Sequence, residues 1–444
     1  MIKQNAQKHA CCSIAFLLCS SVANGAYASD LVQVYEQAKQ YDPQLLQIAA
    51  QRDAAFEAIN SSQSVLLPQI SLAAGYDVTR SNDMGSFDRN TAMVGVGFSQ
   101  QLYNRSSWVS LALAEQQARQ ADAIYATEQQ SLILRVSTGY FAVLSAQDNL
   151  RFVQAEKRAV GRQLEQTQQR FDVGLSAITD VHDAQAQYDA VLANEILAKN
   201  EVANSFESLR EITGIEYTDI DELDVARFSA SPQPLPIQAL LEQAQQQNLS
   251  LLAARIGQDI ARNAISLAKA SRLPELTFNG NYSYQDISNS YLGSQDGDGT
   301  MYTLGVNLSV PLYTGGAITS QVKIAQYDYV SASEQLEASY RGVQRTVYSN
   351  NNDIVASIGS IQAFEQVVVS AQTALEATEA GFDVGTRTIV DVLDATRRLY
   401  SANQSLSSAR YNYILSTLQL KQATGSLSEQ DIFDINAGLI PSRK

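Results

Sequence analysis

The sequence predicts a mixed α/β membrane protein built as an internal tandem repeat, in which each copy joins a pair of β-strands to a very long helical hairpin. Three observations support this prediction. The 8 prolines leave residues 69–231 and 312–440 free of proline, so long uninterrupted helices can form there. Four segments of about ten residues alternate apolar and polar side chains with the period of a β-strand. The chain also aligns with itself at an offset of 211 residues, Phe171 with Phe382.

Residues 1–28 have the pattern of a secretory signal peptide. Lys3 and Lys8 precede an apolar run from 10 to 23, and Ala26-Tyr27-Ala28 supplies a small-residue cleavage site. All 3 cysteines lie inside this segment, and Leu18 before Cys19 argues against lipidation there. We therefore expect an exported chain without cysteine, which excludes disulfides, thiolate nucleophiles and cysteine metal sites.

Charge and histidine content narrow the function classes further. Loss of Lys3 and Lys8 leaves 29 basic against 46 acidic residues, a net charge of −17, which argues against a nucleic-acid partner and favours a cation-attracting surface. His182 is the one histidine outside the signal, and no nucleophile–base pair is evident, so we expect no enzyme, metal site or cofactor. No later stretch approaches the 18 or so apolar residues of a spanning helix, so if the exported chain enters a membrane, we expect it to do so as a β-barrel.

The first repeat is expected over residues 29–214. A short helix starts near Asp30, and Asp42-Pro43 offers an N-cap and first-turn proline for a helix that runs to about Leu66. A β-hairpin follows over about 69–103, with a polar loop between its strands. On these two strands alone, a soluble hairpin with one buried face is the alternative. A helix from about 106 to 171, near 100 Å long, then leads to a tip at about 171–177 and a return helix to 213.

The second repeat is expected over 237–425, after a linker at 215–236, and is followed by a tail at 426–444. Its β-hairpin spans about 275–312, and Leu273-Pro274 matches Leu67-Pro68 at the strand entry. Its long helical hairpin has a tip at about 382–388. In both tips a Phe-Asp-Val-Gly segment ends one helix at a glycine, and a new helix begins within a few residues.

The helix after the second tip has a heptad pattern. Large residues fill one position and small residues the other, which predicts a left-handed coiled coil with close backbones; these are Val392, Leu399, Leu406, Tyr413 and Leu420, and Ala395, Ala402, Ala409, Ser416 and Ala423. The corresponding helix of the first repeat keeps this register except at Glu195, whose charge could face water or a lumen; the sequence leaves this open.

Four strands cannot enclose a lumen, because small closed barrels need about eight. The barrel is therefore expected to be shared between subunits. Two chains would give eight strands, too narrow for much lumen, and three would give twelve; counting favours three without proving it.

Five features of the chain together resemble the outer membrane efflux protein family. They are the signal peptide, the repeat, the Leu-Pro strand entries, the Pro-Leu-Tyr-x-Gly-Gly segment at 311–316, and the second tip, Val-Gly-Thr-Arg-Thr-Ile-Val-Asp-Val-Leu-Asp at 384–394. The resemblance covers about residues 29–435. It implies a homotrimer whose shared twelve-stranded β-barrel, four strands per chain, continues into a long periplasmic coiled-coil barrel closed by an iris of helices.

The resemblance also assigns residues. Asp391 and Asp394 line the constricted entrance. A gate network joins Arg387 to Thr179 and Asp180 of the neighbouring subunit, with Phe382 at a position where the family has tyrosine. The two tips would accept an adaptor's helical hairpin through Val173, Gly174, Leu175, Val384, Gly385 and Thr386. Without the tyrosine hydroxyl, the closed state is expected to be weaker by about 1 kcal/mol per contact.

The residues themselves partly support these roles. Asp391 and Asp394 are three apart and share a helix face, so a ring of six would attract cations and mutual repulsion would raise some of their pKa values. The simpler interpretation is that Asp391 is the third residue after an N-capping Thr388. Because Asp180 is retained where Ala177 replaces the threonine, the simpler interpretation is weakened.

Three further residues have a functional and a simpler interpretation. Arg387 is a gate clasp or a solvated tip charge. His182 is a pH sensor of the gate or, as we favour, an exposed surface histidine. Trp108 is a membrane-interface anchor or a packing residue.

We therefore expect an exit duct in the outer membrane of a Gram-negative bacterium, extending into the periplasm and contacting outer-membrane lipid. It would receive drugs, detergents or unfolded proteins from an inner-membrane RND, ABC or MFS transporter through a periplasmic adaptor, and would open by untwisting of the tip coiled coils. The alternatives are a self-standing diffusion porin and a periplasmic coiled-coil scaffold. The polar loops at 80–91 and 286–300 are expected to face the outside.

Overall fold

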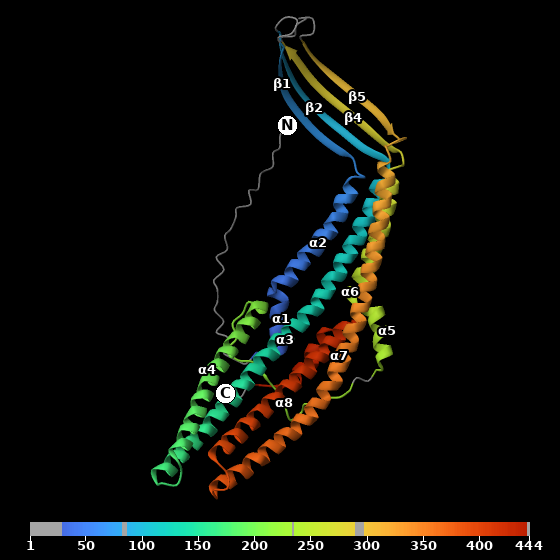
Figure 1. Ribbon diagram of the computed structural model, residues 1–444. Helices are drawn as coiled ribbons and strands as arrows, with labels where there is room; N and C mark the ends of the chain where they lie inside the picture. The colour runs from blue at the N-terminus through green and yellow to red at the C-terminus, as the bar shows by residue number, and fades with distance from the viewer. Residues whose placement is uncertain (1–28, 82–86, 233–234, 289–296, 442–444) are drawn as a thin grey trace, which may run out of the picture.

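A computed structural model describes residues 29–81, 87–232, 235–288 and 297–441. The predicted signal peptide at 1–28 lies outside these residues. The molecule is elongated: a curved sheet lies at one end, and two helical hairpins reach the other end side by side (Figure 1). The fold is mixed α/β, with long helices and a four-stranded sheet, as the sequence predicts.

The four long strands form one antiparallel sheet. They are β1 (Gln69–Ser81), β2 (Phe87–Asn104), β4 (Glu275–Ser288) and β5 (Gly297–Ser309), in the order β1-β2-β4-β5. The central pairing, β2 with β4, joins the two repeats, and it places Val94 opposite Tyr284. Within the described residues, β1 and β5 are edge strands with unpaired backbone groups, so the sheet is left open on both sides.

The strands are longer than expected and the loops correspondingly shorter. Thr79 pairs with Arg89 and Arg80 with Asp88, so most of the loop predicted at 80–91 belongs to the hairpin. Likewise, Asp286 pairs with Asp298, inside the loop predicted at 286–300. These loop boundaries were wrong because polar residues mark loops in sequence, whereas backbone pairing continues through them.

One face of the sheet is apolar and exposed. Register places side chains of the same kind opposite one another on adjacent strands, as in Leu72 with Val96 and Tyr282 with Tyr302. Ile70, Leu72 and Tyr302 are 74%, 75% and 80% exposed, respectively. A continuous apolar band of this kind, with small and polar residues on the opposite face, is typical of a lipid-facing strand surface.

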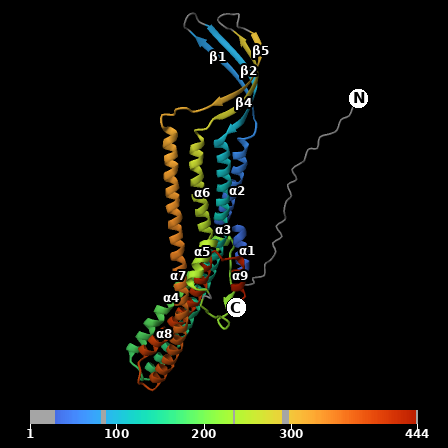
Figure 2. The ribbon, with the colours of Figure 1, turned by 90° about the vertical axis from the view of Figure 1, so that its right-hand side faces the viewer.

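The helices continue the order of the strands. Beneath the sheet, α2 (Pro43–Ser64), α3 (Arg105–Asp172), α6 (Leu249–Ala270) and α7 (Ala317–Asp383) run side by side in the order α2-α3-α6-α7 (Figure 2). At 68 residues, α3 is about 100 Å long. Further from the sheet, α4 (Ile178–Thr213) and α8 (Ile389–Thr424) take the places of α2 and α6, in the order α4-α3-α8-α7.

Short elements gather around the middle of the long helices. They are α1 (Leu31–Tyr41), α5 (Ile237–Gln247), α9 (Glu429–Asn436) and the small pair β3 (Glu222–Leu223) with β6 (Leu439–Ile440). The segments expected as linker and tail thus contribute one strand each to this pair. The largest apolar cluster lies here and includes Leu31, Phe141 and Ile432. This cluster packs the short elements against the long helices at the level from which the two hairpins extend.

The α7–α8 seam follows the predicted heptad. Val392, Leu399, Leu406 and Leu420 are buried, as are all five small residues of the alternate position, while Tyr413 is half-buried. One 18-residue window of α7 is long and apolar enough to cross a membrane by length and composition alone. The expectation that no such stretch exists was therefore wrong. α7 packs along α6 and α8, but only 17% of this window is buried within the chain.

Candidate gate at the helical tips

Each hairpin ends in the same backbone turn. At the end of α3, the N–H of Gly174 donates to the carbonyl of Phe171 and the N–H of Leu175 to that of Arg170. At the end of α7, Gly385 and Thr386 donate in the same way to Phe382 and Gly381. Both are Schellman turns, which require a positive φ at the glycine: φ is 80° at Gly174 and 81° at Gly385. The two turns therefore present the same outline.

The turns expose apolar side chains at the far end of the molecule. Val173, Leu175 and Val384 are 70%, 71% and 76% exposed, and the side chain of Thr386 is also exposed. All six residues expected to dock an adaptor thus lie on the two tips, at the surface of the chain.

Asp391 caps the helix that follows the second tip. Its Oδ2 accepts hydrogen bonds from the backbone N–H and the hydroxyl of Thr388, each at 2.9 Å, and the Thr388 hydroxyl accepts from the N–H of Asp391 at 3.3 Å. These bonds to Thr388 lower the pKa of the Asp391 carboxyl. Within one chain, this is the opposite direction to the one expected from a ring of six carboxylates.

Asp180 has the corresponding position at the first tip. Its Oδ2 accepts from the backbone N–H of Ala177 at 3.2 Å, so half of the capping arrangement persists without a threonine. Retention of Asp180 therefore supports the capping interpretation, contrary to the prediction from sequence. A carboxylate three residues into a helix can accept from the cap N–H whatever the cap's side chain is. For both aspartates, capping and a pore or gate role are compatible.

Asp394 has a partner that sequence reasoning missed. Arg397, one turn later on α8, donates from Nη2 to Oδ1 of Asp394 at 2.6 Å. Both side chains are substantially exposed. The spacing of three residues on a helix could have indicated this pair.

The structure does not join Arg387 to its expected partners within one chain. Among the residues that the structure describes, no hydrogen bond or ion pair links Arg387 to Thr179 or Asp180. The family resemblance places that contact between neighbouring subunits. Arg387 is exposed, and its aliphatic stem lies against the last turn of α7: a Cβ built on Gly381 would stand 2.8 Å from Cγ of Arg387.

Phe382 contacts the first hairpin. The guanidinium of Arg170 lies over its ring, with Cζ 4.6 Å from the centroid. The next residue, Asp383, accepts a hydrogen bond from Nε2 of Gln166 at 3.3 Å. Arg170, Gln166 and Asp383 were all missed from sequence. A signal was present, since Arg170 aligns with Gly381 in two tips that are otherwise closely similar.

A second apolar cluster joins the two hairpins behind the tips. Ile389, Val392, Leu393 and Leu399 of α8 contribute to it, with Val160 of α3 and Ala184 and Val191 of α4. Within it, Gln163 donates to the buried hydroxyl of Thr396 at 3.2 Å. The tips of one chain therefore pack as a unit rather than as independent hairpins.

Glu195, which interrupts the heptad pattern of α4, lies at the interface between α3 and α4. It is buried, and its carboxylate pairs with Lys157 of α3 at 2.7 Å and Lys199 of α4 at 2.8 Å. Hydrogen bonds from Lys157 and then Lys199 lower its pKa to about 2. The sequence left open whether this charge faces water or a lumen; within the chain it is buried between α3 and α4. The two ammonium groups, which reach the carboxylate along their flexible stems, allow it to sit between the helices.

Two remaining candidates are exposed in the single chain. His182 lies at the surface of α4, in line with the simpler interpretation, and Trp108 is 54% exposed in the first turns of α3. Within the described ranges, no cluster of three or more potential metal ligands is found.

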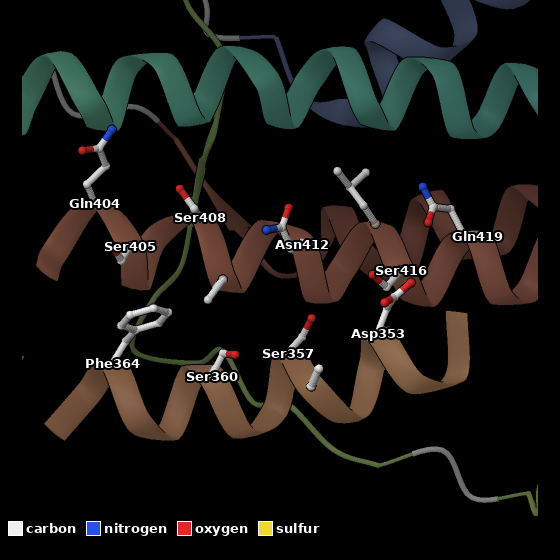
Figure 3. Close-up of a pocket in the computed structure, with 13 residues that line it drawn as sticks. Asp353, Ser357, Ser360, Phe364, Gln404, Ser405, Ser408, Asn412, Ser416 and Gln419 are labelled. Atoms are coloured by element: carbon white, nitrogen blue, oxygen red, sulfur yellow. The ribbon is translucent and has the colours of Figure 1, made fainter. Parts of the chain in front are cut away.

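A polar groove of about 720 Å³ runs between α7 and α8 (Figure 3). Ser357 and Ser360 line it from α7, and Ser408, Asn412 and Gln419 from α8. Hydroxyl and amide groups of this kind make a hydrophilic wall with one carboxylate, Asp353. No ligand-specific arrangement of charges is present among these residues.

Comparison with known proteins identifies relatives over nearly the whole chain. The model of the family described as "Outer membrane efflux protein" matches residues 34–215 and 240–426, one match in each repeat. The chain is 61% identical over 425 residues to outer membrane protein TolC of Vibrio cholerae, covering 96% of this chain and 97% of that protein. It is 27% identical to the alkaline protease secretion protein AprF of Pseudomonas aeruginosa, covering 96% and 90%.

A solved structure has the same fold. The outer membrane protein VceC of Vibrio cholerae superposes with a TM-score of 0.73 at 19% identity, covering 89% of this chain and 96% of that one. At this identity the likeness concerns the fold alone.

Proposed function

The chain belongs to the outer membrane efflux protein family and is an outer-membrane exit duct; from this premise we propose that its two helical tips form the gate of the duct. The observation that supports the gate most directly is the distance between the apolar sheet and the tips. A 68-residue helix separates them, so a sheet held in a membrane would place the tips about 100 Å away, beyond its periplasmic face. A simple diffusion porin has no use for such an extension.

We propose that three copies form the duct. One chain supplies four strands, and the edge strands β1 and β5 leave two open edges for neighbouring copies. Lateral pairing of three chains would close a twelve-stranded barrel wide enough for a lumen. At the other end, α4 and α7 are the outer helices of the four, and both carry exposed apolar residues, including Leu197 and Val369.

Asp391 and Asp394 are the proposed constriction. Both lie in the first turns of α8, next to the tip, where a threefold arrangement would bring six carboxylates around one axis. Such a ring attracts cations and would exclude anions. Arg387, exposed beside Asp391, would bind Thr179 and Asp180 of the neighbouring subunit and keep the ring narrow.

We propose that opening separates the α7–α8 hairpin from its neighbours. Each hairpin is held together internally, α7 to α8 by a seam of large apolar and small residues and α3 to α4 by the buried Glu195–Lys157 ion pair, so each would move as a unit. A partner can open the gate only by binding the open arrangement more tightly. The exposed Val173-Gly174-Leu175 and Val384-Gly385-Thr386 surfaces are the proposed docking sites for a periplasmic adaptor.

The adaptor would connect the duct to an inner-membrane RND, ABC or MFS transporter. Drugs, detergents and unfolded proteins are the proposed cargo. A relative named as a protease secretion protein supports protein cargo, and the family description supports efflux.

Single-channel conductance in a planar bilayer tests the gate. The wild-type protein is expected to give a small, cation-selective conductance, and Arg387→Ser a conductance several-fold larger. Arg398→Ala, which removes an exposed arginine of α8 further from the tip, is the matched control and should behave as wild type. A large wild-type conductance unaffected by Arg387→Ser would instead favour an open porin. Trimeric protein that forms no channel would favour the coiled-coil scaffold.

A further inference from the structure

The contact between α3 and the end of α7 is specific in its geometry. The guanidinium of Arg170 lies 4.6 Å from the centroid of the Phe382 ring, within the range of a cation–π interaction. The Arg170 side chain is only 25% exposed, so water screens the contact weakly. Phe382 itself is half-buried and packs against the apolar cluster behind the tips.

Two polar contacts to the next residue accompany the stacked pair. Oδ1 of Asp383 accepts from Nε2 of Gln166 at 3.3 Å and lies 4.0 Å from Nη1 of Arg170. Gln166 and Arg170 are four residues apart, so they project from one face of α3. Together they hold two consecutive residues at the last turn of α7.

The tips are asymmetric at this point. Position 170 of the first tip is arginine, and the aligned position of the second tip is Gly381. Conversely, Ser176 of the first tip aligns with Arg387 of the second. Gly381 leaves room for the stem of Arg387, whose Cγ would stand 2.8 Å from a Cβ there. The last turn of α7 is thus flanked by two arginines, one from its own tip and one from α3.

We propose that Arg170, supported by Gln166, is a further gate residue that clasps the end of α7 to α3 within each subunit. The proposal rests on the proposed gate and concerns a contact inside one chain, distinct from the Arg387 contact between subunits. An aromatic ring needs no hydroxyl to bind a guanidinium face, so the clasp works with phenylalanine at position 382. Arginine suits the role because its planar group stacks on the ring while its positive charge lies 4.0 Å from the carboxylate of Asp383.

The clasp favours the closed state if opening moves α7 relative to α3. Untwisting of the α7–α8 hairpin would carry Phe382 and Asp383 away from Arg170 and Gln166, so the contacts exist in the closed state only. A contact present in one state alone shifts the equilibrium by its full strength. A partly desolvated cation–π contact corresponds to a factor of about five to thirty in the ratio of open to closed.

The test is the open-state occupancy of single trimers in a planar bilayer. Arg170→Gln is expected to raise the ratio of open to closed at least about fivefold. Gln168→Ala is the matched control, because Gln168 lies on the same helix and bonds only to Asp172 of that helix among the described residues. It should leave the ratio unchanged. If Arg170→Gln does not fold, Asp383→Ala is the second variant, because that side chain is 64% exposed; it should also raise the open-to-closed ratio.

A double-mutant cycle with Phe382→Leu identifies the mechanism. If Arg170 acts through the ring, Arg170→Gln adds little in the Phe382→Leu background, and the two effects do not multiply. If the effects of Arg170→Gln and Phe382→Leu on the open-to-closed ratio multiply independently, the proposed Arg170 contact is overturned. It is also overturned if Arg170→Gln has the wild-type open-to-closed ratio while Arg387→Ser opens the channel. Failure of Arg387→Ser to open the channel would count against the proposed gate instead.

Discussion

Arg387 occupies the space that a side chain at Gly381 would need: a Cβ on Gly381 would lie 2.8 Å from Cγ of Arg387. The aliphatic stem of Arg387 can therefore lie against the last turn of α7 because position 381 has no side chain. The atoms that a Cβ at position 381 would meet are Cγ and Cβ of Arg387, which belong to the stem rather than to the guanidinium. Arg387 is positioned by backbone packing as well as by its charge.

Gly381→Ala is expected to displace Arg387 and loosen the gate. The added methyl group should raise single-channel conductance several-fold, as is expected for Arg387→Ser, while thermal stability stays near wild type because alanine favours the helix. Gly342→Ala is the control, since a Cβ at this α7 glycine meets nothing within 4 Å. Equal conductance in both variants would show that the stem's position does not matter.

Gly425→Ala is expected to destabilise the protein strongly. Gly425 has a φ of 78°, and a Cβ there would stand 2.3 Å from the carbonyl oxygen of Gln247, a backbone atom that cannot move alone. Its counterpart Gly214 has a φ of 70° but meets only Tyr41 at 3.9 Å. Gly214→Ala should therefore lose about 1 kcal/mol from backbone strain, and Gly425→Ala clearly more. Chemical denaturation of both variants measures the difference, and equal losses would contradict it.

Stability of the α3–α4 seam should depend on pH through Glu195. Its folded pKa is lowered to about 2, so its contribution is present above the unfolded pKa of about 4.5 and is lost as pH falls toward 2. The difference in unfolding midpoint between wild type and Glu195→Gln should be constant from pH 8 to 5 and shrink below 4.5. Glu201→Gln, an exposed glutamate of the same helix, is the control. A difference that grows on acidification would refute the ion-pair account.

Arg397→Ala is expected to make the channel more cation-selective. Arg397 pairs with Asp394 at 2.6 Å and offsets part of the negative charge proposed for the constriction. Its removal should move the reversal potential in a salt gradient toward the cation limit, and Asp394→Asn should move it the other way. Arg398→Ala removes the neighbouring exposed arginine and should leave the reversal potential unchanged. An identical shift in both arginine variants would indicate a general charge effect.

Local pattern was enough to predict much of the architecture. Proline placement, period-2 alternation and heptads are short-range properties, so they indicated the helix and strand ranges directly, and Gly174 and Gly385 marked turns that their backbone conformation requires. The same local chemistry showed that Asp391 could be an N-terminal cap. The boundaries failed only where polar residues continued a strand, as at Arg80 and Asp88.

Tertiary packing determines whether residues at equivalent positions of the two repeats are buried or exposed. His182 and Leu393 occupy the same place in the two repeats, yet His182 is exposed and Leu393 is buried. The reason is that α8 lies between α3 and α7, whereas α4 is the outer helix of the four. The stacking of Arg170 on Phe382 likewise joins helices that are distant in sequence, and the burial of Glu195 depends on Lys157 of the neighbouring helix. Short-range sequence patterns are sufficient to predict the elements and their repeat. Which side chains meet follows from the packing of the hairpins, because those contacts depend on neighbours in three dimensions.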